Sequence, residues 1–359
     1  MSSQFVAALN ALMNEDEPVT RDVFLGLSAP SRAEAALFCA RFASISAARR
    51  REIATLLFEQ AERDFMLDYS DLFVACLDDA DATVRCRAVE GLWEDERTLL
   101  IAPLVRLLHS DPSTEVRAAA AVSLGRFVYL AECDQLDVRR AEMVRQALRQ
   151  TANDPQEQIE VMRRAIESLA YINDEEMRRL IDRAYSHGDE RVRESALFAM
   201  GRSADRFWAE TVLGDLLDPS PAIRYEAVRA SGELHLRRAV PRIIELGDDT
   251  DREVQTMAIW ALGQIGGRRA RAVLERWASD DDEARATAAA EALEELEFAN
   301  ISFDMLLVDA EDALAFGPEA GAQDDPEDDD LDDWGDDDEA AEEDEEDEES
   351  WPDEFLDLR

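Results

Sequence analysis

Apolar residues in this chain recur with the spacing of amphipathic helices. One example is DPSTEVRAAAAVSLGRF, residues 111–127. Its apolar positions on one helical face are Val116, Ala120, Ala121, Leu124 and Phe127. An Asp or a Pro opens such segments, which suits a helix N-cap or first turn. A second amphipathic segment follows each one, as in IAPLVRLLH and AVPRIIELG. The pattern therefore predicts pairs of helices and no sheet.

The first segment of each pair returns at a near-constant interval. Alignment on a central alanine gives steps of 32, 45, 31, 31, 31 and 30 residues. The aligned residues are Ala88, Ala120, Ala165, Ala196, Ala227, Ala258 and Ala288. Such a period is typical of a solenoid, in which stacked copies bury faces that one helix pair cannot. The 45-residue step holds an insertion at about 127–143, which we expect to lengthen one connection between helices.

The repeated string V-R-x-x-A-x-x-x-L-G behind an Asp resembles the HEAT repeat in its short bacterial form, the phycobilisome-lyase HEAT-like repeat. The resemblance covers about residues 70–298. It implies an all-α, right-handed α–α superhelix with the motif helix on the concave surface. It also implies that each motif Arg meets a turn Asp of an adjoining unit. The motif arginines are Arg85, Arg117, Arg193, Arg224 and Arg285. Met162 and Gln255 replace Arg in two units, where we expect the Arg–Asp ladder to be interrupted.

Four segments follow from the repeat and from composition. Residues 1–70 are expected to form an N-terminal helical cap with a degenerate repeat, and residues 71–298 seven repeats. Residues 299–316 are expected to cap the last repeat. Residues 317–359 form an acidic tail, predicted to be disordered because its charge density opposes collapse.

Charge is extreme but unevenly placed. The net charge is −45, and the tail alone contains 24 acidic residues and one Arg. The rest of the chain still carries 59 acidic and 37 basic residues, which argues against phosphate-backbone binding as its main role. All 38 basic residues are Arg. Arg offers bidentate and stacked contacts that Lys does not, although a GC-rich genome also explains this composition.

Catalytic chemistry is not indicated. The deoxyhypusine hydroxylases resemble this family and carry His-Glu pairs that bind a di-iron centre. The matching pairs here are Cys86-Arg87, Ala118-Ala119, Glu194-Ser195, Tyr225-Glu226 and Thr256-Met257. None contains His, so such a site is not expected. Nothing marks a tetrapyrrole site of the phycobilin lyases either. We therefore expect no catalytic residues, no cofactor and no metal.

The chain is expected to lie in the cytoplasm of a bacterium. Its four cysteines show no CxxC pair, which fits reduced thiols. The N-terminus lacks the basic region of a signal peptide. No apolar run reaches the roughly 18 residues of a membrane span, so no membrane association is expected.

A binding surface is predicted from helical geometry. The position two residues after the central alanine lies opposite the core, at about 100° per residue. Across the units it holds Glu90, Val122, Glu167, Phe198, Arg229, Trp260 and Ala290. Flanking positions add Tyr171, Arg202, Tyr225, Met257 and Gln264, with Arg126, Arg163 and Arg164 in earlier units. Aromatic side chains mixed with Arg are typical of interface hot spots, so these residues are predicted to form a groove for a protein partner. In the alternative, curvature, the insertion or the tail covers them.

The acidic tail contains Trp334 and ends in SWPDEFLDLR. The apolar residues of that ending are Trp351, Phe355, Leu356 and Leu358. Three interpretations remain: a solubilising tail, a motif that docks into another protein, or a pseudo-ligand that occupies the groove of its own chain, aided by tethering.

Taken together, the sequence predicts a non-catalytic scaffold that binds a protein partner. Two alternatives remain. The first is a nucleic-acid-associated protein whose tail mimics nucleic acid, although the acidic body makes nucleic acid an unlikely partner. The second is a bilin-lyase-like protein.

Overall fold

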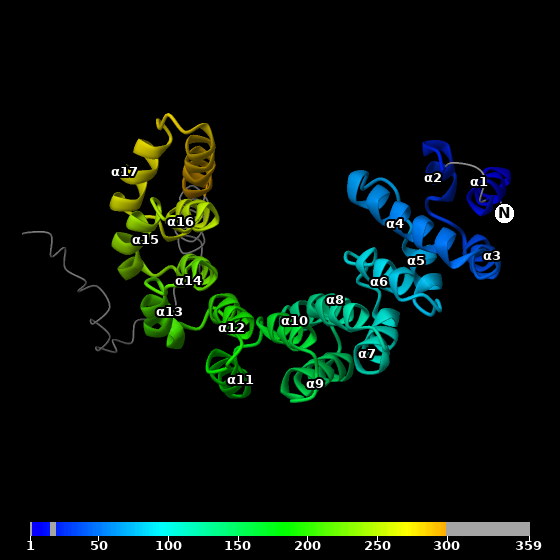
Figure 1. Cartoon of the computed structure of the whole chain (residues 1–359), viewed down its shortest axis with the longest axis horizontal. Coiled ribbons are helices and arrows are strands. Elements are labelled where there is room, and N and C mark those ends of the chain that lie inside the picture. Colours follow the sequence, from blue (N-terminus) through cyan, green and yellow to red (C-terminus); the bar gives the residue numbers. More distant parts are fainter. Residues whose placement is uncertain (1, 15–18, 299–359) are drawn as a thin grey trace, which may run out of the picture. The chain divides into compact units, whose positions relative to one another are not determined.

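The structure is a computed structural model that describes residues 2–14 and 19–298. Every regular element in those ranges is helical (Figure 1). The first nine α-helices are α1 (Ser3–Met13), α2 (Arg21–Leu27), α3 (Arg32–Phe42), α4 (Ala47–Arg63), α5 (Ser70–Cys76), α6 (Ala82–Glu90), α7 (Ile101–Ser110), α8 (Thr114–Glu132) and α9 (Val138–Asn153). They are followed by α10 (Ile159–Leu169), α11 (Glu175–Tyr185), α12 (Glu190–Arg202), α13 (Ala209–Asp215), α14 (Pro221–Glu233), α15 (Val240–Leu246), α16 (Arg252–Ile265) and α17 (Arg268–Trp277).

Short 3₁₀ helices precede three of these elements. They are η1 (Thr98–Leu100) before α7, η2 (Arg206–Trp208) before α13 and η3 (Arg237–Ala239) before α15. Residues 283–298 are also helical. No helix in the described ranges combines the length and the apolar character needed to cross a membrane.

Local sequence sets where the helices begin. The side chains of Asp81, Asp189 and Asp251 each accept hydrogen bonds from backbone N–H groups in the first turn of α6, α12 and α16. Ser113 does the same for α8, and α14 begins with Pro221. These contacts satisfy donors that have no partner inside the helix. The predicted Asp cap is confirmed for α6, α12 and α16 and the predicted Pro in the first turn for α14, whereas Ser113 caps α8 in place of an Asp or a Pro.

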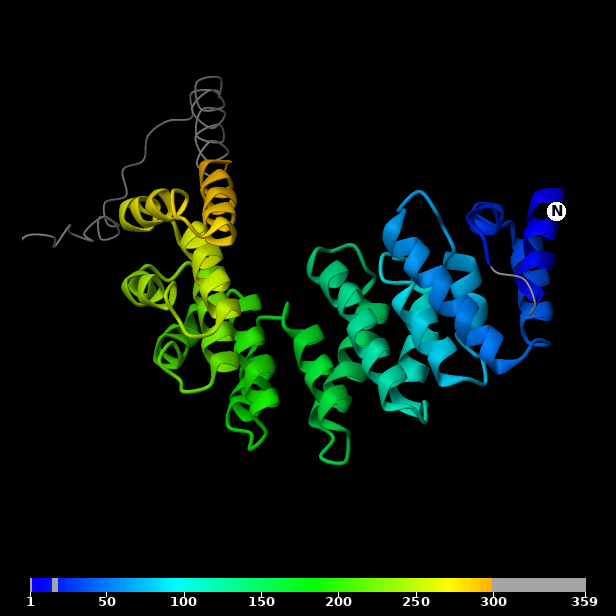
Figure 2. The ribbon, with the colours of Figure 1, turned by 45° about the horizontal axis from the view of Figure 1, so that its top comes forward.

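The helices form two layers (Figures 1 and 2). In one layer α4, α6, α8, α10, α12, α14 and α16 pack side by side in chain order, and we call them the motif helices. The second layer consists of α5, α7, α9, α11, α13, α15 and α17, each following its motif helix. This arrangement is an α-solenoid, as the repeat predicted.

Small residues let neighbouring motif helices approach closely. A Cβ atom added to Gly201 in α12 would lie 2.7 Å from the Cα atom of Ala230 in α14. One added to Gly232 would lie 3.1 Å from the Cα atom of Ala261 in α16. Each pair lies near the C-terminal ends of both helices, so neighbouring motif helices run in the same direction.

The core lies between the two layers. The aligned alanines from Ala88 to Ala258 are all buried, whereas Ala288 is half-buried and its neighbour Ala289 is buried. One apolar cluster extends from Phe5 to Leu234, and a second joins Leu216 to Ala292. The central position of the motif was therefore correctly identified for the first six units.

The insertion at about 127–143 does not lengthen a connection, contrary to expectation. Instead, it lengthens helices: α8 has 19 residues and α9 has 16, whereas α12 and α14 have 13 each. The added part of α8 continues the apolar face, because Phe127, Val128 and Leu130 are buried. Burial of these side chains favours helix over loop.

Candidate functional site

Motif arginines join successive units through ion pairs. Arg85 donates two hydrogen bonds of 2.7 Å to the carboxylate of Asp111. Arg224 donates two of 2.8 Å to Asp249. Both arginines lie near the start of a motif helix, and both acids lie in the turn before the next one. Each pair therefore ties one unit to the following unit.

The other three motif arginines also form ion pairs. Arg193 contacts Asp218 at 3.1 Å and Arg285 contacts Asp248 at 2.9 Å. Arg117 pairs with Glu157 at 2.8 Å rather than with an Asp. Gln255, which replaces a motif Arg, only donates a hydrogen bond to a backbone carbonyl, that of Asp249.

The groove residues of the middle units lie together. The guanidinium carbon of Arg229 is 4.0 Å from the centroid of the Phe198 ring. That of Arg202 is 5.7 Å from the centroids of both Phe198 and Tyr171. We call the solvent-facing side of α10, α12, α14 and α16 the motif-helix face. Stacking of Arg on aromatic rings gives this face rigid, partly apolar side chains.

Two aromatic residues on this face are less exposed than the helical arithmetic predicted. Phe198 and Trp260 are half-buried, and Trp260 lies over Gly232 of the preceding motif helix. Of the seven outward positions, only Val122 and Ala290 are exposed. The prediction of a fully exposed position is therefore wrong for most units, because the long side chains there contact their own helix, as Glu90 does, or a neighbouring helix, as Trp260 does.

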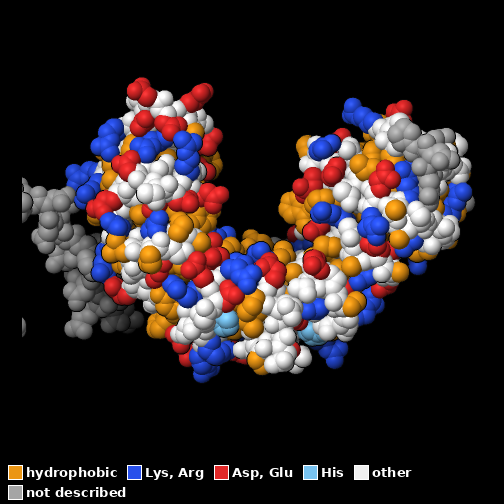
Figure 3. Space-filling view, in the orientation of Figure 1, with side chains coloured by type: hydrophobic (Ala, Val, Ile, Leu, Met, Phe, Trp, Pro, Cys, Tyr) orange, Lys and Arg blue, Asp and Glu red, His pale blue; other side chains and the backbone are white. Residues whose placement is uncertain are grey.

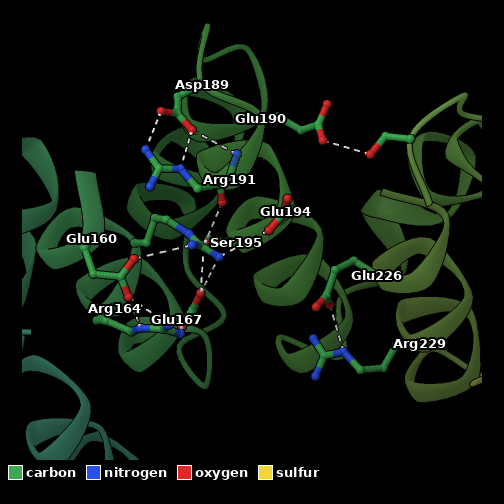
Figure 4. Close-up of polar contacts among 12 residues, drawn as sticks. Glu160, Arg164, Glu167, Asp189, Glu190, Arg191, Glu194, Ser195, Glu226 and Arg229 are labelled. Carbon is green, nitrogen blue, oxygen red and sulfur yellow. Dashed lines mark hydrogen bonds and ion pairs between the residues drawn. The ribbon is translucent and has the colours of Figure 1, made fainter. Parts of the chain in front are cut away.

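Carboxylates accompany the arginines of the motif-helix face (Figure 4). Arg163 donates to the hydroxyl of Ser195, which in turn donates to Glu167. Arg164 bridges Glu160 and Glu167 at 2.8 and 2.7 Å. The arginines predicted for the groove are thus already paired within the chain.

Further carboxylates on this face belong to α12 and α14. Arg163 also contacts Glu194, at 3.3 Å. Arg229 pairs with Glu226 at 2.9 Å, and both residues lie on α14. Sequence analysis missed the role of these acids. The i, i+3 spacing of Glu226 and Arg229 signals their pair, whereas Glu194 lies 31 residues from Arg163, where no local spacing gives a signal.

Two of these carboxyl groups, those of Glu226 and Glu194, have raised pKa values. Burial raises the pKa of Glu226, and the nearby Arg229 only partly opposes this effect. Burial also raises the pKa of Glu194. Loss of solvation disfavours the charged form of an acid, so these groups would gain from an added cation.

Two recesses open between α12, α14 and α16. One of about 240 Å³ is lined by Glu194, Tyr225, Glu226 and residues of the adjoining turns. The other, of about 380 Å³, is lined by Tyr225, Met257 and their neighbours on α16. Tyr225 belongs to both, so the recesses adjoin. The predicted residues Tyr225 and Met257 therefore border hollows that can receive side chains of a partner.

Two predicted residues lie apart from this face. Arg126 donates to the backbone carbonyls of Leu92 and Trp93, and burial lowers its pKa to about 10. Gln264, at the C-terminal end of α16, donates to Glu295 in the last described helix. The tail residues proposed as a motif, Trp334, Trp351, Phe355, Leu356 and Leu358, lie outside the described residues, as does the predicted cap at 299–316.

The surface is mixed in charge. In Figure 3, acidic and Arg side chains alternate over the face shown, with apolar side chains between them. No group of three or more potential metal ligands meets in the part of the chain that the structure describes. The arrangement suits recognition of a macromolecule with both charged and apolar groups.

Known proteins share this architecture. Residues 70–159 and 210–294 match a family model described as HEAT repeats. Yeast importin-beta (Kap95p) is similar with a TM-score of 0.50 and 14% identity, covering 82% of this chain and 46% of that protein. The CpcE–CpcF complex of phycocyanin lyase from Nostoc sp. PCC7120 has a TM-score of 0.46 and 17% identity, covering 62% and 86%.

Human deoxyhypusine hydroxylase has a TM-score of 0.32 and 17% identity, covering 82% of this chain and 96% of that protein. At these identities the likeness concerns the fold alone. Among curated proteins, none matches the sequence significantly.

Proposed function

Because residues 70–159 and 210–294 of this chain are HEAT repeats, we propose that the protein is a non-catalytic scaffold that binds a protein partner on the motif-helix face. Solenoids of this type commonly mediate protein interactions. The binding residues are those that line or adjoin the recesses of α12, α14 and α16. Tyr225 and Met257 lie at the centre of this binding surface, and the stacked Phe198, Arg202 and Arg229 lie beside them.

One observation carries this proposal. The Tyr225 ring and the Met257 side chain border two adjoining recesses, and an ion pair of Glu226 with Arg229 and stacking of Arg229 on Phe198 hold the neighbouring side chains. Rigid aromatic anchors beside small hollows lower the entropic cost of binding. A binding role needs no catalytic group, which fits the paired state of the polar residues on this face.

The acidic tail is proposed to regulate this surface or to recruit a second partner. The support is its composition, since it combines 24 acidic residues with a terminal apolar motif. Comparison of 1–359 with 1–316 in partner capture separates the two roles. A regulatory tail predicts stronger capture by 1–316, whereas a recruiting tail predicts capture by 1–359 alone.

The scaffold role is tested by replacing Met257 with Ser together with Tyr225→Ser and identifying captured proteins by mass spectrometry. A protein held by the motif-helix face should be lost from the double variant. The matched control is Met143→Ser in α9, where the Met side chain is exposed on the second layer. The control should retain the partner.

If the double variant folds and captures the same proteins in the same amounts as the control, the motif-helix face is not the binding surface. Thermal melting followed by circular dichroism verifies folding of both variants. A catalytic role would instead appear as chemical change of a captured molecule, which the proposal does not predict.

A further inference from the structure

Exposed aromatic side chains follow the edge of the solenoid at which the motif helices end. Each of five successive motif helices, from α4 to α12, contributes one such residue at or just beyond its C-terminal end. We call this row the aromatic edge; its members are Phe65, Trp93, Tyr129, Tyr171 and Phe207, with exposed fractions of 90, 61, 51, 36 and 64%. Because neighbouring motif helices run in the same direction, these ends lie side by side.

Four of the five members of the aromatic edge lie in pairs. Phe65 and Trp93 line the same recess. The rings of Tyr129 and Tyr171 meet edge to face, with their centroids 5.3 Å apart. The guanidinium of Arg178 lies 5.2 Å from the centroid of Phe207. The row therefore contains two pairs of neighbouring rings, Phe65 with Trp93 and Tyr129 with Tyr171, and the single ring of Phe207.

The recess between Phe65 and Trp93 is strongly acidic. It has a volume of about 460 Å³ and lies between the α4–α5 loop and the turn after α6. Its charged lining comprises one cation, Arg97, and five carboxylates, Asp68, Asp71, Glu94, Asp95 and Glu96. Arg97 is engaged by Asp71 and Asp95, at 2.6 and 2.5 Å.

The remaining carboxylates of the recess leave an unbalanced negative charge. Arg126, which donates to the carbonyl of Trp93, attracts Asp95 and Glu96, but no ion pair within 4.0 Å among the described residues includes Glu94 or Glu96. Aromatic faces attract cations through their negative π surface, and carboxylates add direct charge attraction. A hollow bounded by two exposed rings and surplus carboxylates thus fits a guanidinium or ammonium group.

We propose that the aromatic edge binds a basic segment of a partner protein, with one Arg or Lys side chain seated between Phe65 and Trp93. A further cation of the segment would stack on Tyr129, because Arg202 and Arg178 already lie over the rings of Tyr171 and Phe207. The recess between Phe65 and Trp93 lies beside α4 and α6, whereas the motif-helix face belongs to α10, α12, α14 and α16, and the two surfaces meet only where Tyr171 contacts Arg202. The proposal therefore goes beyond the proposed function and does not depend on it.

Net charge favours a basic segment over two other possible occupants, the chain's own tail and a second copy of the chain. The chain's own tail has a net charge of −23, and a second copy of the chain carries −45. Both would place further negative charge beside the carboxylates of the recess, and like charges at this range repel. A basic segment is instead attracted by the negative charge of these carboxylates.

The test uses the full chain with ¹⁵N-labelled Trp and a hexa-arginine peptide as the probe. The indole N–H signal of Trp93 is identified by its disappearance in Trp93→Phe. Oligocations also contact an acidic tail. The test therefore depends on which Trp signal shifts, not on the total amount of peptide bound. Addition of the peptide should shift the Trp93 signal saturably, and raised salt should reverse the shift.

Variants supply the second readout. Phe65→Ser should weaken the affinity reported by the Trp93 signal about tenfold, the effect of losing one partly desolvated cation–π contact. Leu217→Ser is the matched control, because Leu217 is 63% exposed but lies away from the aromatic edge, after α13. It should leave the affinity unchanged. A hexa-citrulline peptide, which keeps the shape without the charge, should not shift the signal.

Three results would overturn the proposal. Shifts confined to Trp334 and Trp351 would place the cations on the tail alone. An equal response to the citrulline peptide would show that binding does not depend on the positive charge of the peptide. A Trp93 signal that moves with protein concentration in the absence of peptide, and does not respond to peptide, would identify a second copy as the occupant.

Discussion

The Arg224–Asp249 pair allows a quantitative test of how the units are held together. Arg224 lies in α14 and Asp249 lies in the turn before α16, with 13 and 6% of their side chains exposed. Arg224 also donates to the carbonyls of Asp218 and Pro219. Replacement by Met keeps most of the apolar stem but removes the charge and every one of these bonds.

Arg224→Met leaves the carboxylate of Asp249 poorly compensated. Its remaining partners are the backbone N–H of Asp251 and the hydroxyl of Thr250. Breaking a buried ion pair by removing one partner costs about 3–5 kcal/mol. The partial exposure of Arg224 places the expected loss in free energy of unfolding at the lower end, about 3 kcal/mol.

A double-mutant cycle with Asp249→Asn isolates the pair. Neutralising both partners removes the uncompensated charge, so the double variant should be less destabilised than the sum of the single variants by about 2 kcal/mol. Urea unfolding followed by near-UV circular dichroism measures this energy. Gln255→Met, which removes one neutral hydrogen bond in the next unit, is the control and should cost about 1 kcal/mol.

The effect should also depend on pH. The hydrogen bonds from Arg224 lower the pKa of Asp249 below 3.8. The pair therefore contributes stability above that pH, and this contribution is lost as the pH falls through the lowered value. The difference between wild type and Arg224→Met should shrink accordingly. A coupling energy below about 0.5 kcal/mol at pH 7 would refute the view that the pair fastens neighbouring units.

Two further predictions concern packing and buried charge. Gly201→Ala should destabilise the protein by about 1–3 kcal/mol because its Cβ would press on Ala230, whereas Gly214→Ala, with no atom within 4 Å, should be neutral or stabilising; thermal melting distinguishes them. Glu226→Gln should be at least as stable as wild type at pH 7, since burial raises the pKa of Glu226 and its ionised form costs stability as the pH rises. That advantage should disappear below the ordinary Glu pKa of 4.5. Urea unfolding midpoints of both proteins at pH 7 and pH 4 measure this change. A lower midpoint for Glu226→Gln than for wild type at pH 7 would contradict the prediction.

Much of the fold could be predicted because every repeat carries the same pattern of apolar and small residues. The buried faces of the motif helices follow from a 3.6-residue period, and the close approach at Gly201 and Gly232 follows from residue size. The motif Arg contacts follow from the resemblance, with Arg117 differing in its partner. Such features depend on neighbours close in sequence or exactly one repeat away.

The candidate site was harder to predict because its features arise between helices. A helical wheel assumes one buried side, but a motif helix is covered by the second layer and by a neighbour on either flank. Long side chains at the outward position, such as Phe198 and Trp260, are therefore half-buried. Phe65 and Trp93 lie in connections between helices, where no period exists to signal a shared edge.

The missing arginines have a mechanical consequence. Every Arg–carboxylate pair between units adds stiffness to one joint of the solenoid, and a joint without a pair bends at lower cost. Met162 on α10 supplies no charge, but the adjacent Arg163 pairs with Glu194 of α12 at 3.3 Å. Gln255 on α16 supplies only a neutral hydrogen bond, but Arg285 of the last described helix pairs with Asp248 in the turn before α16 at 2.9 Å. The joints on either side of the recesses at Tyr225 are therefore fastened by substitute ion pairs, and the solenoid should resist bending there even where the motif Arg is absent.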